Sequence, residues 1–412
     1  MVQDPAPDRQ GGRPFTLTPF RGLRFDPDTV GELSTVISPP YDMLDADTVR
    51  TLENANRRNI VRLILSRRFE RPYQAVRDRL EKWRDKSYLR ADDEPTLYLY
   101  EYSAEQVTVR GLIGLVGLRS EDEGVILPHE DVMPAPVDDR AVLMRTTQTN
   151  LEPILLAHQG SGRLREIVGD AARSRPLADF VALDGSAHRL WGITDRSVQA
   201  EVAEELRDTQ ALIADGHHRY AAYLRLQAEL RGGDSAPDCS PWDHGLAMLV
   251  DQADQALRVG PIHRSVAAMT MSDLQDLAED RGDSLSLHRD REAAFDELAA
   301  QPHAERATFM VSDGYAWAVL GVARTHDIDA AVLHETLLPA WGIADEQVGY
   351  HHSLDQALHA TTRAPGLVVA VRPPTVEQVR ASAARGERMP RKSTSFGPKP
   401  RMGVVMRDLR DA

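Results

Sequence analysis

The sequence predicts a mixed α/β protein, because apolar runs of two kinds alternate along its 412 residues. Short apolar runs between turns, such as 109–118 and 245–251, are typical of buried strands. Segments with apolar residues three or four positions apart, such as 198–207, are typical of amphipathic helices. Hydrophobic residues make up 42% and charged residues 27%, which indicates ordered globular domains rather than disorder.

The first hundred residues predict a tail followed by helices and strands. Residues 1–14 are polar and rich in Pro and Gly, which is typical of a flexible tail. After a rigid Pro-Pro break, Asp45 is placed to cap a helix. Residues 60–65 indicate a strand, and residues 74–86 predict a helix from their apolar period.

The next segments predict a hairpin and a candidate loop. Residues 96–100 and 109–118 are apolar enough to form neighbouring strands. Residues 127–140 contain several prolines among charged residues, so we expect irregular structure there. A polar loop between ordered elements is a common place for functional residues.

The second half predicts further alternation of helices and strands. Residues 211–214 form a short apolar run that leads directly into a helix of about four turns ending at Leu230. Beyond it we expect strands at 245–251, 307–311, 316–322 and 367–371, and helices at 272–281, 292–301, 327–341 and 376–385. We divide the chain into a tail at 1–14, an N-terminal α+β region at 15–150, a core at 151–270, a C-terminal α/β region at 271–390 and a basic segment at 391–412.

The overall charge narrows the classes of partner. The formal net charge is −14, so the long-range field disfavours DNA or RNA, and any phosphate site must be a local cluster of basic groups. Cys239 is the only cysteine, which excludes an intramolecular disulfide and a multi-cysteine zinc site and fits a reducing, cytoplasmic location. No window approaches the roughly 18 apolar residues of a membrane span.

The strongest candidate for chemistry is the turn DGHHR, residues 215–219, between the short strand and its helix. The start of a helix offers unpaired N–H groups and partial positive charge to an anion. Gly216 lets a phosphate approach the backbone, and Arg219, His217 and His218 add donors. Asp215 is placed either to take a proton from a hydroxyl or simply to cap the helix, and the pattern alone leaves both readings open.

Two other clusters are candidates. His129 and Glu130, followed by the acidic and basic residues up to Arg140, have the ligand types for a divalent cation or a phosphate, although a solvated loop gives the same pattern. Lys392, with neighbouring Ser, Thr, Lys and Arg residues, is a local basic segment in an acidic chain. It lacks the glycine spacing of a Walker motif, and a solvated C-terminal segment is the alternative.

Seven blocks in order along the chain resemble the family called domain of unknown function 1015. They run from about residue 15 to 408 and are FRGLRF, VISPPYD, LPHE followed by DDR, LWGITD, ADGHHRY, GPIHR and KSTSFGPKP. Two positions depart from the family pattern, which more often has Thr at Ile262 and a basic residue at Asp131. The turn at 215–219 matches without change.

The DGHHR turn is similar to the nucleotide-phosphate turn of the ParB and sulfiredoxin superfamily, especially that of free serine kinases. The resemblance implies a ParB/sulfiredoxin-like core in 151–270, with Gly216, His217, His218 and Arg219 on the phosphates and Asp215 as the candidate base. His217 stands where sulfiredoxin has its cysteine, so sulfinic acid reduction is not expected.

The resemblance therefore implies a small-molecule kinase. It would transfer a phosphoryl group from ATP or ADP, with Mg²⁺, to a hydroxyl acceptor such as free serine. His217 and His218 would assist catalysis, Arg140 and Lys392 are further cofactor-binding candidates, and His129 and Glu130 are the metal candidates. The alternatives are a non-catalytic nucleotide-binding switch and a metal-dependent hydrolase. The oligomeric state stays open, with a homodimer as one option.

Overall fold

A computed structural model describes residues 13–65, 72–104, 107–231, 240–254, 257–300 and 306–411. The chain forms two compact units. The first comprises Met1–Pro128, Val132–Leu257 and Pro398–Ala412, and the second comprises His129–Asp131 and Arg258–Gly397. Both units combine helices and strands, so the predicted mixed α/β class is confirmed. Cys239 and most of the predicted tail lie outside the described residues.

The first unit is built on a large sheet. Among the described residues it has nine strands in the order β6-β11-β8-β12-β5-β4-β10-β9, with β1 paired to β5. Their bounds are β1 Leu17–Thr18, β4 Leu97–Ala104, β5 Val107–Gly117, β6 Ile126–Leu127, β8 Ile154–His158, β9 Ala178–Val181, β10 Ala187–Ile193, β11 Ala211–Asp215 and β12 His244–Asp251. The predicted hairpin at 96–118 and the short strand before the DGHHR turn are both present.

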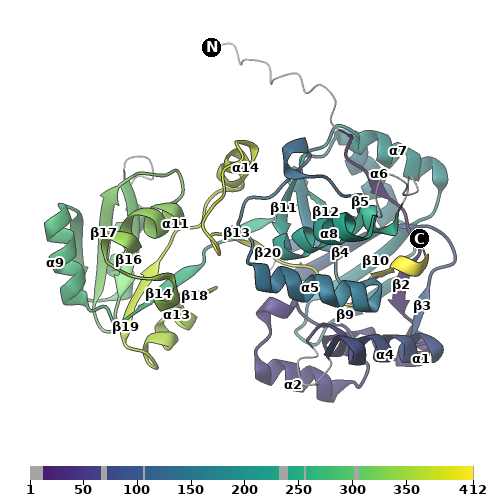
Figure 1. Cartoon of the computed structure of the whole chain (residues 1–412), viewed down its shortest axis with the longest axis horizontal. Helices are drawn as coiled ribbons and strands as arrows, with labels where there is room; N and C mark the ends of the chain where they lie inside the picture. The colour runs from purple at the N-terminus through teal and green to yellow at the C-terminus, as the bar shows by residue number, and fades with distance from the viewer. Residues whose placement is uncertain are drawn as a thin grey trace, which may run out of the picture. The chain divides into compact units, whose positions relative to one another are not determined.

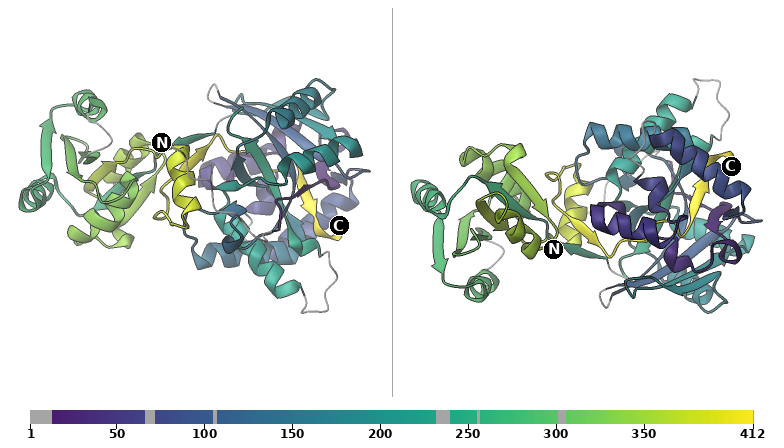
Figure 2. Two further views of the ribbon diagram at one scale, coloured as in Figure 1. Left: turned by 90° about the horizontal axis from the view of Figure 1, so that it is seen from above. Right: turned by 90° about the horizontal axis from the view of Figure 1, so that it is seen from below.

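One face of this sheet forms a single apolar core with four helices. Side chains alternate along each strand, so Leu97 and Leu99 point to this core while Tyr98 and Tyr100 do not. The helices are α5 Pro134–Thr147, α6 Gly162–Ala172, α7 Arg196–Leu206 and α8 His217–Leu230. Helices α5 and α8 pack against each other (Figures 1 and 2). The core thereby fixes where α8 begins.

A smaller sheet and a second apolar cluster complete the first unit. Strands β3 Leu89–Ala91, β2 Gly22–Phe25, β21 Met406–Asp408 and β7 Thr149–Asn150 pair in that order. Between β2 and β3 the chain forms four α-helices and two short 3-10 helices: α1 Pro27–Val30, η1 Leu33–Thr35, η2 Tyr41–Met43, α2 Ala46–Ala55, α3 Val61–Ile64 and α4 Pro72–Asp85. The end of the chain therefore returns to the first unit.

The second unit has its own sheet and core. Its described strands follow the order β15-β17-β16-β19-β14-β18, and β13 pairs with β20. Their bounds are β13 Arg258–Gly260, β14 His263–Ala267, β15 Ser284–His288, β16 Arg306–Ser312, β17 Trp317–Ala323, β18 Val348–His351, β19 Gly366–Ala370 and β20 Ser395–Gly397. The helices include α9 Met271–Arg281, α10 Arg291–Ala300, α13 Leu354–Thr361 and α14 Val376–Ala384.

The predicted helix at 327–341 is irregular in the second unit. It divides into α11 Asp329–Ala331, a π-helical segment η5 Val332–Leu337 and α12 Leu338–Ala340. Such π-helical insertions are rare and often mark functional positions. The remaining short helices are η3 Glu121–Glu123, η4 Pro241–Asp243, η6 Asp345–Gln347 and η7 Leu409–Asp411.

Two local predictions are wrong. Residues 60–65 were expected to be a strand, but they hold helix α3, which the buried side chain of Asn59 starts by accepting from the N–H of Val61 at 3.0 Å. A short apolar run alone does not distinguish a buried helix from a strand. Residues 127–140 were expected to be irregular, but α5 begins at Pro134, because proline is compatible with the first helical turn.

No helix among the residues described combines the length and the apolar character needed to cross a membrane.

Candidate functional site

The DGHHR turn lies where the sequence analysis expected it. Strand β11 ends at Asp215, Gly216 is the N-cap, and α8 begins at His217. Gly216 has φ 97°, and a Cβ atom there would lie 2.9 Å from Ile154 Cγ2 and 3.1 Å from Arg219 Nε. Both the backbone conformation and the lack of space therefore require glycine at this position. The result is a helix N-terminus of fixed orientation at the edge of the core.

The carboxylate of Asp215 is held by two cations. Lys399 Nζ lies 2.6 Å from one oxygen, and Arg219 Nη2 lies 2.5 Å from the other. The same ammonium is 2.5 Å from the carboxylate of Asp42. Three sequence blocks that are far apart in the chain, PPYD, DGHHR and GPKP, therefore meet at one point in the first unit. Asp42 and Lys399 were not among the predicted site residues.

The pairing sets the protonation states at this point. Burial alone would raise the pKa of Asp215, but Lys399 and Arg219 outweigh it and hold the pKa well below its usual value. Burial would lower the pKa of Lys399, but Asp215 and Asp42 outweigh it and raise the pKa above its usual value. Asp215 is therefore a carboxylate and Lys399 an ammonium throughout the physiological range.

Arg219 is an internal support of the turn. Its side chain is buried, and its guanidinium donates to the carbonyl of Pro153 as well as to Asp215. Glu152 lies 3.7 Å from the same guanidinium. Because Arg219 already satisfies these groups, its predicted contact with a phosphate would add to an existing network. That contact stays a prediction.

Arg140 extends the same network. Its Nε donates to Asp139 at 2.9 Å, its Nη1 lies 4.0 Å from Glu152, and its guanidinium sits over the ring of Tyr41 at 5.3 Å. Glu152 is buried, and burial raises its pKa even though Arg219 and Arg140 oppose the rise. Glu152 was not among the predicted site residues. The one signal for it in the sequence is its place directly before the apolar run at 153–158.

The two histidines of the turn have different roles in the structure. The Nε2 atom of His218 accepts a hydrogen bond from the N–H of Met133 at 3.0 Å, at the N-cap of α5. Because an N–H only donates, this contact fixes His218 as the neutral Nδ1–H form. His217 lies near enough to Asp215 to help lower the pKa of that carboxyl. Their predicted catalytic roles stay predictions.

A buried polar network holds the segment that carries Lys399. On one side of Lys399, the hydroxyl of Tyr102 donates to the carbonyl of Pro398 at 2.6 Å. On the other side, Arg401 donates to Ser186 Oγ at 3.0 Å and pairs with Asp184. The ammonium of Lys399 is thus positioned by contacts at the residue before it and two residues after it.

His188 continues this network inward. Ser186 donates its one hydroxyl proton to Asp184 at 2.6 Å, so it accepts from His188 Nε2 at 2.8 Å. The hydroxyl of Tyr100 then donates to His188 Nδ1 at 2.9 Å. Burial, with a smaller effect of Arg401, lowers the pKa of His188 to about 4. The imidazole is therefore neutral and structural.

The other predicted residues belong to the second unit. His129 is buried, its Nε2 is 2.8 Å from Thr394 Oγ1, and its carbonyl accepts from the N–H of Met389 at 2.9 Å. Glu130 forms an isolated parallel bridge with Met389, and Lys392 has φ 60°. Among the described residues no group of three His, Cys, Asp or Glu side chains is arranged to hold a metal ion. The metal role of His129 and Glu130 stays a prediction.

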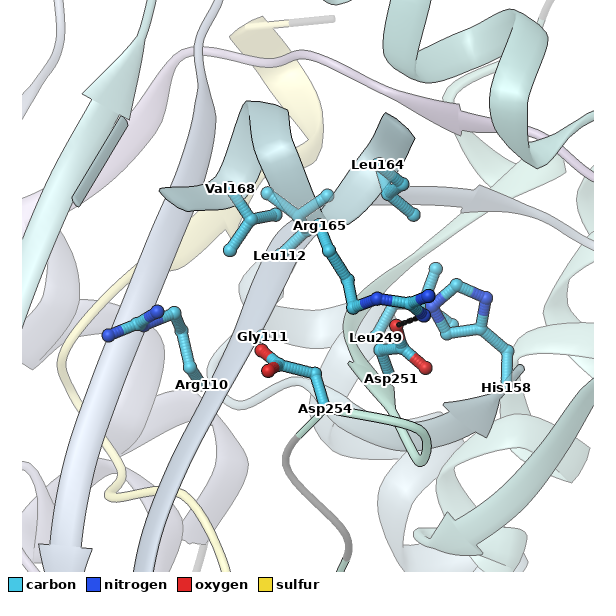
Figure 3. Close-up of a pocket in the computed structure, with 10 residues that line it drawn as sticks. All are labelled: Arg110, Gly111, Leu112, His158, Leu164, Arg165, Val168, Leu249, Asp251 and Asp254. Atoms are coloured by element: carbon cyan, nitrogen blue, oxygen red, sulfur yellow. Dashed lines mark hydrogen bonds and ion pairs between the residues drawn. The ribbon is translucent and has the colours of Figure 1, made fainter. Parts of the chain in front are cut away.

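A small pocket in the first unit is separate from the turn. His158, Arg165, Asp251 and Asp254 line its polar side, and Arg165 pairs with Asp251 at 3.1 Å (Figure 3). Its volume is about 20 Å³, which is room for about one water molecule. No residue of the DGHHR turn lines it, so it is separate from that candidate site.

A comparison with known families identifies the family to which the chain belongs. The family model described as protein of unknown function (DUF1015) matches residues 17–341, which is more than half of the sequence. The chain belongs to this family. The matched range includes the whole DGHHR turn and its helix, whereas Lys399 lies beyond it. No curated protein matches this DUF1015 protein.

Several solved structures are similar to this DUF1015 protein at low identity. A mutant free serine kinase in complex with ADP is 14% identical, over 72% of this chain and 91% of that one, with a TM-score of 0.38. A conserved hypothetical protein from Pyrococcus furiosus is 16% identical over 73% and 96%, with a TM-score of 0.38. SbnI from Staphylococcus aureus, with a C-terminal truncation, is 12% identical over 70% and 84%, with a TM-score of 0.35. Because every TM-score is below 0.5, none of these likenesses decides a function for this chain.

Proposed function

We propose that this DUF1015 protein is a small-molecule kinase that binds a nucleoside di- or triphosphate at the DGHHR turn. The phosphates would accept from the N–H groups at the start of α8, which have no partners within the helix. Gly216 supports this geometry because it adopts the left-handed backbone, with φ 97°, from which α8 starts. His217 and His218, the first two residues of the helix, would add donors beside the phosphates.

The observation that carries the proposal is the carboxylate of Asp215 directly beside that helix start. Lys399 and Arg219 hold it deprotonated and orient both of its oxygens. A carboxylate of low pKa is a weak base, but phosphoryl transfer depends mainly on positioning and charge neutralisation. Asp215 would therefore orient the attacking hydroxyl of a small acceptor such as free serine, while the ammonium of Lys399 offsets negative charge.

Mg²⁺ is compatible with the side chains at this point. The ion usually keeps several waters and binds one or two carboxylates together with substrate phosphates, so it does not need a cage of protein ligands. Asp42 and Asp215 would supply these carboxylates, both of which now share the ammonium of Lys399. When bound, the ion would neutralise charge on the phosphates.

The direct test is product formation by the intact chain. Wild-type protein with ATP or ADP, Mg²⁺ and free serine should give a new phosphomonoester signal in the ³¹P NMR spectrum. Asp215→Asn should lower the rate while nucleotide still binds, and Asp254→Asn, an exposed carboxylate of the separate pocket, should not change it. Nucleotide binding without any product would refute the kinase and favour the non-catalytic switch.

A further inference from the structure

The hydroxyl of Tyr41 has no hydrogen-bond partner in the part of the chain that the structure describes. Tyr41 is the first residue of η2, is half-buried, and packs its ring against the second apolar cluster of the first unit. The guanidinium of Arg140 lies over the ring, 5.3 Å from its centroid. Because a tyrosine in such a place usually pairs its hydroxyl, a phenol that is held only by its ring is available to a ligand.

Tyr41 completes a closed loop of contacts at the DGHHR turn. Six side chains of the loop carry charges of alternating sign and are, in order, Asp42, Lys399, Asp215, Arg219, Glu152 and Arg140. Tyr41 joins the two ends, because it precedes Asp42 in the chain and its ring lies against Arg140. The contacts that locate the phenol therefore lead on both sides to Asp215.

The phenol also lies within electrostatic reach of the turn. Burial raises the pKa of Tyr41, Arg219 opposes the rise, and Glu152 and Asp215 add to it. The same interaction acts on the partner: burial would lower the pKa of Arg219, but Glu152, Asp215 and Tyr41 raise it. The hydroxyl therefore keeps its proton at neutral pH and can donate a hydrogen bond.

We propose that Tyr41 selects the acceptor of the kinase by donating a hydrogen bond from its hydroxyl to a carboxylate of that molecule. This inference rests on the proposed function, in which Asp215 orients the hydroxyl that is phosphorylated. Hydrogen bonds from a hydroxyl to a carboxylate are about twice as strong as those between neutral groups. The cation of Arg140 over the ring strengthens the phenol as a donor. Tyr41 makes and breaks no bond in the transfer itself, and the acceptor would be a small hydroxy acid such as serine.

Calorimetric titration of free serine into the intact chain, with AMP and Mg²⁺ present, tests this contact. AMP lacks the terminal phosphoryl group that the kinase would transfer, so the titration measures binding alone. Tyr41→Phe keeps the ring and removes only the hydroxyl. It should weaken serine binding at least tenfold and leave the affinity for AMP within twofold of the wild type.

Tyr88 provides a matched control in the same unit. Its ring packs against the same apolar cluster and lies under a guanidinium, that of Arg58, 4.0 Å from the centroid. Its hydroxyl, however, is already paired with Arg58 Nη2 at 3.0 Å. Tyr88→Phe should therefore bind serine with the wild-type affinity.

Ethanolamine, which is serine without its carboxylate, tests which group Tyr41 recognises. It should bind the wild type at least tenfold more weakly than serine does, and Tyr41→Phe should bind it as the wild type does. Four results would overturn the proposal: serine affinity in Tyr41→Phe within twofold of the wild type, equal losses for serine and ethanolamine, a matching loss of AMP affinity, or no serine binding by the wild type.

The acceptor contact and the kinase fail in different ways. If the wild type forms phosphoserine and Tyr41→Phe has the same KM for serine, the role of Tyr41 is wrong and the kinase stands. If serine binds in a manner that depends on Tyr41 but the ³¹P spectrum shows no product, the kinase is wrong and the carboxylate contact stands.

Discussion

The two units treat buried charge in opposite ways. In the first unit the charges alternate in sign from Asp42 through Lys399, Asp215 and Arg219 to Glu152, so each ion has a partner of opposite sign. In the second unit Arg264 is at least as deeply buried but rests on neutral acceptors. The paired charges form a rigid scaffold around the start of α8, whereas Arg264 rests on neutral hydrogen-bond acceptors, with the carboxylate of Glu130 acting only at longer range.

The largest expected effect comes from a substitution that interrupts the row of alternating charges in the first unit. Lys399→Met would leave the carboxylates of Asp42 and Asp215 facing each other without their shared ammonium. Removing one partner of a buried pair costs about 3–5 kcal/mol. Urea unfolding should show this loss in the unfolding free energy, while Lys86→Met, at an exposed lysine, should cost little. Equal losses in the two variants would mean that the chain of charges does not stabilise the unit.

Acid should weaken the first unit through its buried histidines. Burial is the main cause that lowers the pKa values of His158 and His188 to about 4. The unfolded chain binds protons first, near pH 6.5, so stability is present above that pH and is lost as the pH falls toward 4. Between pH 6.5 and pH 5, each of these histidines lowers the free energy of unfolding by about 2 kcal/mol.

Urea unfolding at pH 7 and pH 5 measures this loss. The imidazole of His158 makes no hydrogen bond to any of the described residues, so His158→Leu should reduce the pH dependence without leaving a partner unsatisfied. A wild-type unfolding free energy that is the same at both pH values would contradict the assignment of neutral, buried imidazoles.

A matched pair of glycines tests the geometry of the turn. Gly216 and Gly162 both stand at the start of a helix, but only Gly216 has a left-handed φ and a crowded Cβ position. Gly216→Ala should cost about 1–3 kcal/mol, because the left-handed backbone is strained for alanine. Gly162→Ala should be neutral or slightly stabilising. Thermal unfolding of both variants measures the difference, and equal midpoints would argue against a strained turn.

The smallest expected effect concerns Lys392 in the second unit. The backbone of Lys392 is left-handed, a conformation that glycine adopts without strain. Lys392→Gly should therefore leave the unfolding free energy the same or raise it by up to about 1 kcal/mol. The same change at Lys82, inside α4, should lower it by about 1 kcal/mol. A large loss at Lys392 would mean that its side chain is needed for folding.

Sequence patterns predicted the local parts of the site but not its tertiary contacts. The strand, the turn and the helix around Gly216 follow from apolar period and glycine chemistry, which act over a few residues. Lys399 and Asp42 could not be assigned to Asp215, because nothing in the local sequence shows which distant segment returns to it. The helix at 61–64 was missed because a segment of four residues is too short to show a helical period.

Local sequence also does not show which charged side chains are paired in the folded protein. Arg219 was expected to present its fork to phosphate, and the sequence did not show that Pro153, Asp215 and Glu152 surround it. Conversely, the neutral acceptors of Arg264 come from His334 and Lys392, which lie far from it in the chain. Composition gives the number of charges, whereas the fold decides which of them are neutralised.

Calorimetric titration of ADP with Mg²⁺ into the wild type, Gly216→Ala and Gly162→Ala tests the central claim most directly. Each variant is measured below its own unfolding transition. We expect the wild type and Gly162→Ala to bind ADP with the same affinity and Gly216→Ala to lose at least tenfold, because its methyl group would meet Ile154 and Arg219 and shift the start of α8. Equal binding by all three proteins, or none by the wild type, would contradict a nucleotide site at the DGHHR turn.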